Sequence, residues 1–227
     1  MMIETPKDLV PRFFEKTAQT YDRVVNLTTF GKDKYWKKEV LKKISPCHSI
    51  LDLACGTGIL TFQIAEKFPD ATMVGVDVTE SYLAIARKKL KSHHHITFLH
   101  EDAEKLSLES KFDCITSSYL PKYCNPEILI TICLMHLNSD GKIILHDFTY
   151  PKNNIAKSLW NLYFIILKVI GYFTPSWQSV FEDLPKLIRR SNWLHEYENT
   201  MKRNGMQVEV QLLTWSCSAV LTGTKKI

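Results

Sequence analysis

The sequence predicts an α/β fold in which a doubly wound, mostly parallel sheet carries helices on both faces. Three observations predict it: short apolar runs alternate with helical stretches, a glycine-bearing loop follows the first run, and acidic residues stand where runs end. With 227 residues, 45% of them hydrophobic and 23% charged, the chain can bury one sizeable core. Disordered, collagen-like and small disulfide-rich classes are excluded.

The central elements follow one another as strand and helix. The run Ser49-Ile50-Leu51-Asp52-Leu53-Ala54 predicts a first strand, and apolar residues from Ile59 to Phe68 at helical spacing predict the helix after it. The same alternation then predicts, in order, a strand over 72–77, a helix over 82–90, strands over 96–100 and 112–118, a helix over 126–137 and, after an Asp140-Gly141 turn, a strand over 142–148. Strands joined in this way form βαβ units and therefore a parallel sheet.

Two segments lie outside this alternation. Residues 6–43 have helical character with several large aromatic side chains. The later segment is expected to contain a long apolar helix over 154–172, a polar helical stretch over 181–204, and strands over 207–213 and 216–222. Because no repeat or low-complexity linker interrupts the chain, a single domain is expected over 1–227.

Composition and charge exclude several function classes. Lys and Arg exceed Asp and Glu by 29 − 24 = 5, which is too small an excess for a nucleic-acid-binding protein. The six cysteines form no C-x-x-C pair, so they are expected to be small core residues in a reducing compartment. Residues 1–16 lack the apolar stretch of a secretory signal, and the apolar run 159–173 is shorter than a spanning helix needs. A cytoplasmic location and no membrane span are expected.

The segment Asp52-Leu53-Ala54-Cys55-Gly56-Thr57-Gly58 is a candidate ligand-binding loop, because it lies where a strand turns into a helix. A dinucleotide-binding loop would carry a third glycine where this chain has Thr61, and the Asp52 carboxylate would repel a diphosphate. An uncharged or cationic ligand is therefore favoured. Asp77 ends the second strand, where a carboxylate can accept hydrogen bonds from two ribose hydroxyls.

These residues, with Asp102-Ala103 after the third strand, resemble the class I S-adenosylmethionine-dependent methyltransferases from about residue 49 to 148. The resemblance implies a Rossmann-like, seven-stranded sheet with an antiparallel last strand, and S-adenosyl-L-methionine as cofactor. It implies that residues 52–58 hold the amino-acid end and the sulfonium, Asp77 the ribose, and Asp102-Ala103 the adenine. The full implied set of cofactor-binding residues is Asp52, Ala54, Gly56, Thr57, Gly58, Asp77, Val78, Asp102, Ala103 and Ser118.

A narrower resemblance comes from the flanking segments. The pattern Phe13-Phe14-(x6)-Tyr21-Asp22-(x3)-Asn26-(x4)-Gly31-(x4)-Trp36-Lys37 is similar to the N-terminal signature of the ubiquinone/menaquinone biosynthesis C-methyltransferases. Residues 137–151 and the pair Leu213-Thr214 also resemble theirs. This implies C-methylation of a quinol or prenylated aromatic. Residues 119–123 depart from the family's Phe-Gly-Leu-Arg-Asn, with Lys122 at the arginine, so a lipid, terpenoid or other secondary metabolite stays an alternative acceptor.

Methyl transfer is an in-line displacement, so the protein must align the acceptor, exclude water and assist the loss of a proton. The strand-end candidates for this chemistry are Tyr21, Tyr119, Lys122, His146 and Asp147. We expect Asp147 or His146 to assist deprotonation and Tyr21 to cover the cofactor. A non-catalytic cofactor-binding partner subunit is the alternative from another class; polar groups at the rim argue against it. An NAD-dependent dehydrogenase is disfavoured by the missing third glycine.

Two further stretches bear on partners. The apolar helix over 159–173 is expected to be buried, to line a cavity for a hydrophobic small-molecule acceptor, or to lie on a membrane. Lys32–Lys43 holds six lysines against two acids, which fits a solvated helix face or peripheral docking on anionic lipid. His93-His94-His95 is interpreted as a polar loop, and no metal site is expected. The oligomeric state is open, with a homodimer as one alternative.

The resemblance divides the predicted domain into four parts. Residues 1–45 form an N-terminal helical cap and residues 46–150 the cofactor-binding core. Residues 151–205 form acceptor lid helices, and residues 206–227 the C-terminal strands.

Overall fold

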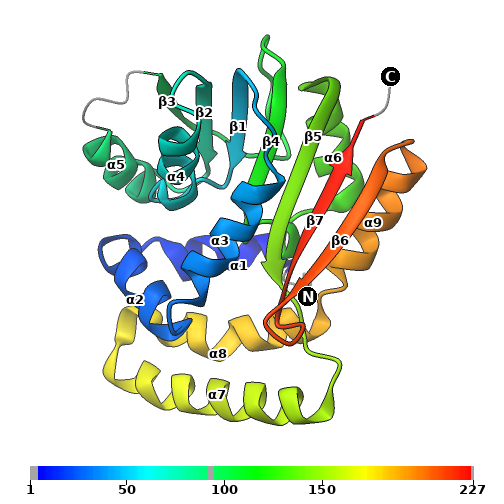
Figure 1. Ribbon diagram of the computed structural model, residues 1–227. Coiled ribbons are helices and arrows are strands. Elements are labelled where there is room, and N and C mark those ends of the chain that lie inside the picture. Colours follow the sequence, from blue (N-terminus) through cyan, green and yellow to red (C-terminus); the bar gives the residue numbers. More distant parts are fainter. Residues whose placement is uncertain (1–4, 91–94, 226–227) are drawn as a thin grey trace.

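The computed structural model describes residues 5–90 and 95–225, and places within them a seven-stranded sheet of order β3-β2-β1-β4-β5-β7-β6 (Figure 1). The strands are β1 (Ser49–Leu53), β2 (Thr72–Asp77), β3 (Ile96–His100), β4 (Phe112–Ser118), β5 (Leu137–Phe148), β6 (Gln207–Leu213) and β7 (Ser218–Thr224). β1 to β5 are mutually parallel, and β7 is antiparallel to both of its neighbours. The predicted fold class, including the antiparallel last strand, is confirmed.

Helices cover both faces of this sheet and its lower edge (Figure 1). They are α1 (Leu9–Phe14), α2 (Tyr21–Thr28), α3 (Lys32–Lys43), α4 (Ile59–Lys67), α5 (Glu80–Lys89), α6 (Pro126–Met135), α7 (Asn154–Phe173), α8 (Pro175–Arg190) and α9 (Trp193–Arg203). One face packs against α3, α4 and α5, and the other against α6 and α9. Because side chains alternate along a strand, Ile143 and Leu145 of β5 enter one core and Ile144 the other.

A third apolar cluster lies beyond the carboxyl ends of the parallel strands. It joins Phe13 of α1 to side chains of α7 and α8, among them Trp160 and Trp177. Figure 1 shows α8 beneath α1 and the sheet, with α7 as the lowest layer. This arrangement places a helical cap over the edge of the sheet where the loop after β1 lies.

The structure corrects three predicted boundaries. Leu137 opens β5 instead of closing the helix before it, and Asp140, with φ of 60°, lies in an irregularity inside the strand where a turn was expected. The polar stretch over 181–204 is two helices, because α8 begins at Pro175 and the helical backbone breaks at Ser191-Asn192. β7 begins at Ser218, after the turn that joins it to β6.

Candidate active site

The loop after β1 has an unusual backbone. Ala54, Gly56 and Gly58 all have positive φ, of 55°, 58° and 82°, so the chain alternates in and out of the left-handed region before α4 begins. Glycine adopts this conformation without steric cost, whereas Ala54 is strained in it. At Gly58 a Cβ atom would also lie 2.6 Å from the Phe62 ring. The backbone conformation of the loop therefore requires glycine at positions 56 and 58.

Asp77, at the end of β2, fixes this loop from the neighbouring strand. Its carboxylate accepts hydrogen bonds from the backbone N–H of Gly56 at 2.8 Å and of Thr79 at 2.8 Å. Burial raises its pKa above the ordinary value, although these hydrogen bonds oppose the shift. The Asp77 side chain lines the cavity described below, where it is available as an acceptor.

Asp52 lies on β1, beneath the loop, and is buried. It accepts hydrogen bonds from the hydroxyls of Thr61 at 2.6 Å and Thr116 at 3.0 Å, and burial raises its pKa to about 6. Thr61, which stands where a dinucleotide-binding loop would have glycine, thus has a positive function: it donates to the carboxylate under the loop. Asp52 lines a small recess of about 30 Å³, together with Thr57 and the buried Lys37.

Asp102 and Ala103 follow β3 at the far end of the same edge. The Asp102 carboxylate accepts from the Lys7 ammonium at 2.7 and 2.8 Å and from the backbone N–H of Glu104 at 3.0 Å. Partial burial alone would raise the pKa of Asp102, but the Lys7 hydrogen bonds hold it below its ordinary value. The N-terminal segment therefore closes over this end of the site.

These elements enclose a cavity of about 580 Å³, a size suited to a cofactor and a small molecule. Of the predicted cofactor-binding residues, those that line it are Ala54, Gly56, Asp77, Val78, Asp102, Ala103 and Ser118. Asp52 and Thr57 line the adjoining recess, which shares Tyr21 and Tyr119 with the cavity. Gly58 lines neither the cavity nor the recess, and it contributes by allowing the backbone turn before α4. The structure thus brings nearly the whole predicted set together.

The opposite wall of the cavity is aromatic. Tyr21 of α2 lies with its ring centroid 5.0 Å from Tyr82 and 6.4 Å from Phe14, and it stacks on Trp177 of α8 at 6.1 Å. Burial raises the pKa of the Tyr21 and Tyr82 hydroxyls above the ordinary tyrosine value, so both phenols stay protonated at neutral pH. This wall is apolar apart from its hydroxyls and excludes water from the space between Tyr21 and the strand ends.

Tyr119 connects the two walls at the end of β4. It has a positive φ of 74°, its ring stacks on Phe148 at 4.8 Å, and its hydroxyl donates to Asp33 at 2.7 Å. Lys37 pairs with the same Asp33 and lies 4.8 Å from the Tyr119 ring centroid. Of the four predicted catalytic residues, Tyr21 and Tyr119 line the cavity.

His146, one of the other two, is fully buried and does not line the cavity. Its Nδ1 lies 2.7 Å from the Ser118 hydroxyl and its Nε2 2.8 Å from that of Ser218. Since Ser218 donates its proton to the Asp147 carbonyl, this network assigns the ring proton to Nε2 and makes Ser118 the donor to Nδ1. Burial lowers the pKa of His146 well below its ordinary value, so it is a neutral residue that orients Ser118.

Asp147 is also fully buried, on the strand end behind the cavity. It accepts from the Lys122 ammonium at 2.8 Å and from the backbone N–H groups of Lys122 and Phe148 at 3.1 and 2.7 Å. Asp147 and His146 were expected to assist deprotonation; the structure places neither on the cavity wall, since helices cover both faces of β5 and neighbours occupy the polar atoms of these residues. Lys122, expected at the rim, is buried with Asp147.

Sequence reasoning missed several residues of this site. Lys37 and Asp33 were assigned to a solvated or lipid-binding lysine run, yet both are buried on the inner side of α3; their i, i+4 spacing was the available signal. Lys7, Tyr82 and Trp177 reach the site only through contacts between distant segments, for which the sequence holds no local signal. Among the described residues no cluster of His, Cys, Asp or Glu suits a metal ion; His93 and His94 lie outside them.

Comparison with known proteins identifies the family. The model of the ubiE/COQ5 methyltransferase family matches residues 2–225. The chain belongs to this family. Relatives include demethylmenaquinone methyltransferases of Bacteroides fragilis (strain YCH46), 24% identical over 95% of this chain and 92% of the relative, and of Staphylococcus aureus (strain Newman), 25% identical over 97% and 94%. The predicted enzyme class and its S-adenosylmethionine cofactor are confirmed at the level of the family.

Solved structures share the fold of this methyltransferase. Haemonchus contortus phosphoethanolamine N-methyltransferase 2, in complex with S-adenosyl-L-methionine, aligns with a TM-score of 0.68 at 14% identity over 99% of this chain and 61% of its own. The plantazolicin methyltransferase BpumL, in complex with SAH, aligns with a TM-score of 0.65 at 15% identity over 97% and 95%.

The residues present fit the cofactor. The cavity offers carboxylates at two strand ends and a buried carboxylate beneath the loop, a charge distribution that repels phosphates and accepts hydroxyls, amines and a cationic sulfur. Gly56, Asp77 and Tyr119 line the same cavity, so a ligand bound there would lie against the backbone turn at Gly56.

Proposed function

We propose that this methyltransferase transfers a methyl group from S-adenosylmethionine to a ring carbon of a hydrophobic aromatic acceptor of the quinol or prenylated-aromatic class. Its membership of the ubiE/COQ5 family and its demethylmenaquinone methyltransferase relatives support this class. One observation carries the proposal: the cavity has a carboxylate-bearing wall on the strand ends and, facing it, an aromatic wall to which Tyr21 of the cap and Tyr82 of α5 contribute. Such a cavity suits a cationic donor and an apolar planar acceptor side by side.

On the polar wall each residue has a proposed task. Asp77 accepts from the ribose hydroxyls, and Asp102 with Ala103 holds the adenine. Asp52 faces the ammonium of the amino-acid end, while Lys37, whose ammonium pairs with Asp33 and borders the same recess, binds the carboxylate. Lys37→Met is expected to bind S-adenosylmethionine and its decarboxylated analogue equally, whereas the wild type prefers the former; exposed Lys34→Met serves as the control.

On the aromatic wall, Tyr21 covers the reacting groups, and Phe14 and Tyr123 contact the acceptor ring. The stacking of Tyr21 on Trp177 makes α8 part of this cover, so we propose that residues 151–205 act as the lid of the acceptor site. When bound, the cofactor would supply an electrophilic methyl group: its carbon–sulfur bond would break as the carbon–carbon bond forms, S-adenosylhomocysteine would leave, and the proton of the ring carbon would pass to solvent as the products are released. The protein contributes alignment and exclusion of water.

Methyl transfer to candidate acceptors tests the proposal. The purified chain would be incubated with methyl-labelled S-adenosylmethionine and, in parallel, short-chain demethylquinols, prenylated phenols, terpenoids and phospholipids, with the product analysed by mass spectrometry. We expect the label on a ring carbon of a quinol or prenylated aromatic. Turnover only with lipids or terpenoids would overturn the acceptor class. Tight cofactor binding without turnover on any acceptor would instead favour a non-catalytic partner subunit.

A further inference from the structure

The outer side of α7 is an apolar surface that the described part of the chain leaves uncovered. Nine large apolar side chains of this helix are exposed, and Ile165 and Phe173 retain 62% and 83% of their accessible surface. We call this surface the α7 face; its central row consists of Ile155, Leu159, Leu162, Ile166, Val169 and Phe173. Exposed apolar patches of this extent mark interaction surfaces in soluble proteins.

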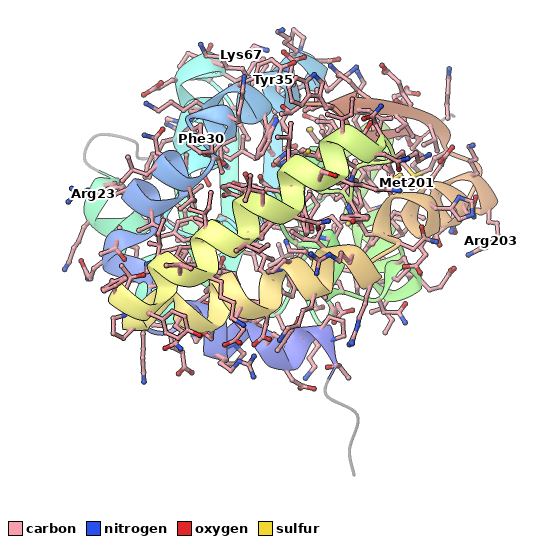
Figure 2. The ribbon with its side chains drawn as sticks, turned by 90° about the horizontal axis from the view of Figure 1, so that it is seen from below. Arg23, Phe30, Tyr35, Lys67, Met201 and Arg203 are labelled. Carbon is pink, nitrogen blue, oxygen red and sulfur yellow. The ribbon has the colours of Figure 1, made fainter. Side chains whose placement is uncertain are left out.

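The opposite side of α7 explains why this face is free. Trp160, Phe164 and Leu167 are buried against α8 and hold the helix in place as the outermost layer of the cap. Figure 2, which views the molecule from below, shows α7 lying across this side of the molecule with α8 next to it. The helix is therefore anchored by one side and presents the other to the surroundings.

The apolar surface continues onto the neighbouring cap helix. The exposed Phe30, after α2, lies 6.0 Å from the ring of Tyr163 of α7, and the Tyr163 hydroxyl donates to the Thr28 carbonyl at 2.6 Å. Figure 2 shows Phe30 beside α7. Leu27 of the same segment is also exposed. The exposed apolar surface thus extends from α7 onto the end of α2.

The charges that the α7 segment itself carries are all positive. Between residues 151 and 174 there are three lysines, Lys152, Lys157 and Lys168, and no acidic residue. Lys168 pairs with Glu182 of α8, and Lys157 lies 5.9 Å from the Tyr150 ring centroid. An apolar helix face whose own segment carries only positive charges complements a surface that is apolar inside and anionic outside.

We propose that the α7 face docks on an anionic lipid bilayer, with α7 lying in the plane of the membrane–water interface. By length and hydropathy α7 is the one helix in the described part of the chain that could cross a membrane, but its packing on α8 holds it across the cap. The face covers about 160° of the helix at 100° per residue, wider than the seam a second helix needs. A flat, fluid surface therefore suits it better than a second copy of the chain.

The position of the face connects it to the cavity. The aromatic wall, α8 and α7 are successive layers below the strand ends, joined by the contacts of Tyr21 with Trp177 of α8 and of Arg189 of α8 with the Trp160 ring of α7. A bilayer bound at α7 would bring an acceptor dissolved in it to the capped side of the cavity. The proposed docking surface belongs to α7 itself and does not depend on which acceptor is methylated.

Vesicle co-sedimentation of the full chain tests the proposal. The wild type is expected to sediment with vesicles of phosphatidylcholine and phosphatidylglycerol, less with phosphatidylcholine alone, and less as salt rises. Leu162→Glu with Ile166→Glu is expected to lower the partition coefficient by about tenfold or more. Ile128→Glu with Met135→Glu on α6 is the matched control, because these side chains are 48% and 53% exposed, against 55% and 50%, and the added charge is equal.

Equal sedimentation of the two double variants would overturn the proposal, as would a wild type that binds no vesicles. A wild-type dimer in light scattering that the α7 variant converts to a monomer would assign the face to a second copy instead. The α7 variant should keep the wild-type thermal unfolding midpoint and circular dichroism spectrum, which shows that its fold is intact. Because vesicle binding is measured without acceptor, its failure is distinguishable from failure of the proposed reaction.

Discussion

Two sets of polar residues lie at the carboxyl ends of parallel strands of the same sheet, and they have different surroundings. Asp77 and Asp102, after β2 and β3, face the cavity and keep acceptor capacity for a ligand. His146 and Asp147, at the end of β5, are fully buried, and Ser118, Ser218 and Lys122 occupy their polar atoms. The sequence alone assigns both sets to chemistry.

The difference teaches that position along a strand is not sufficient to make a residue functional. β5 is flanked by β4 and β7 and covered on both faces, so its polar end is satisfied internally. β2 lies nearer the edge of the sheet, where the loop after β1 opens a crevice. We call these two sets the cavity set and the buried set. Changes in the buried set should affect stability, and changes in the cavity set should affect binding.

The largest expected effect is in the buried set. Lys122→Met leaves the Asp147 carboxylate buried without its cation, which should lower the free energy of unfolding by about 3–5 kcal/mol. Adding Asp147→Asn should restore part of this loss, because it removes the buried charge; its single amide oxygen keeps one of the two backbone N–H bonds, which reach different carboxylate oxygens. Urea denaturation measures both variants. A stable Lys122→Met protein that cannot bind the cofactor would move Lys122 into the cavity set.

The next largest effect is in the cavity set. Asp77→Ala removes the proposed ribose acceptor, and should weaken S-adenosylhomocysteine binding about a hundredfold, or about 2.7 kcal/mol. Asp113→Ala is the matched control: it also loses two backbone N–H bonds, from His48 and Ser49, but at the opposite end of the strands. Calorimetry should show unchanged affinity for Asp113→Ala. Equal losses in the two variants would mean that Asp77 acts only through the fold.

Asp52 predicts a pH dependence. In the folded protein without cofactor, the pKa of Asp52 is about 6, above its ordinary value of 3.8. The folded state therefore holds this proton more tightly than the unfolded chain does. The contribution of protonated Asp52 to stability decreases as pH rises from about 4 to about 6. The cofactor's ammonium favours the ionised Asp52 carboxylate. The affinity of the protein for S-adenosylmethionine should therefore decrease as pH falls below about 6, by up to about tenfold per pH unit when binding is coupled to the loss of one proton. Asp52→Asn should remove this dependence in calorimetric titrations; an unchanged pH profile would exclude Asp52 as its origin.

The smallest effect concerns Ser118, which connects the two sets. Ser118→Ala removes one neutral hydrogen bond at the cavity wall and should weaken cofactor binding about fivefold, or about 1 kcal/mol. His146→Asn should do no more, since His146 acts through Ser118. Single-turnover rates at saturating cofactor should be nearly unchanged in both. A thousandfold loss of rate in His146→Asn alone would show that the imidazole takes part in the chemistry.

Local segments were the most predictable parts of this fold. The limits of β2, β3, β4 and β6 match the prediction, because each is a short apolar run between turn residues. The start of β5 was wrong because Leu137 continues the apolar pattern of the preceding helix, while only tertiary pairing with Phe112 places it in the sheet. The division between α8 and α9 was missed because no glycine or proline marks the break at Ser191-Asn192.

In the site, too, local sequence patterns predict some residues, while contacts between distant segments determine the others. The polar wall is encoded in a contiguous loop and in two strand ends, so its residues could be listed from the sequence and lie together in the structure. The aromatic wall depends on contacts such as Tyr21 with Trp177, which no local pattern predicts. Burial of Lys37 likewise follows from the packing of α3 on the sheet, not from composition.

The central claim is that the cavity at the strand ends holds S-adenosylmethionine, and its most direct test is calorimetric titration of the wild-type chain with S-adenosylmethionine and with NAD. We predict one S-adenosylmethionine bound per chain and no detectable heat with NAD, because Asp52 and Thr61 replace the features that a diphosphate needs. Binding of NAD, or no binding of S-adenosylmethionine, would contradict the account.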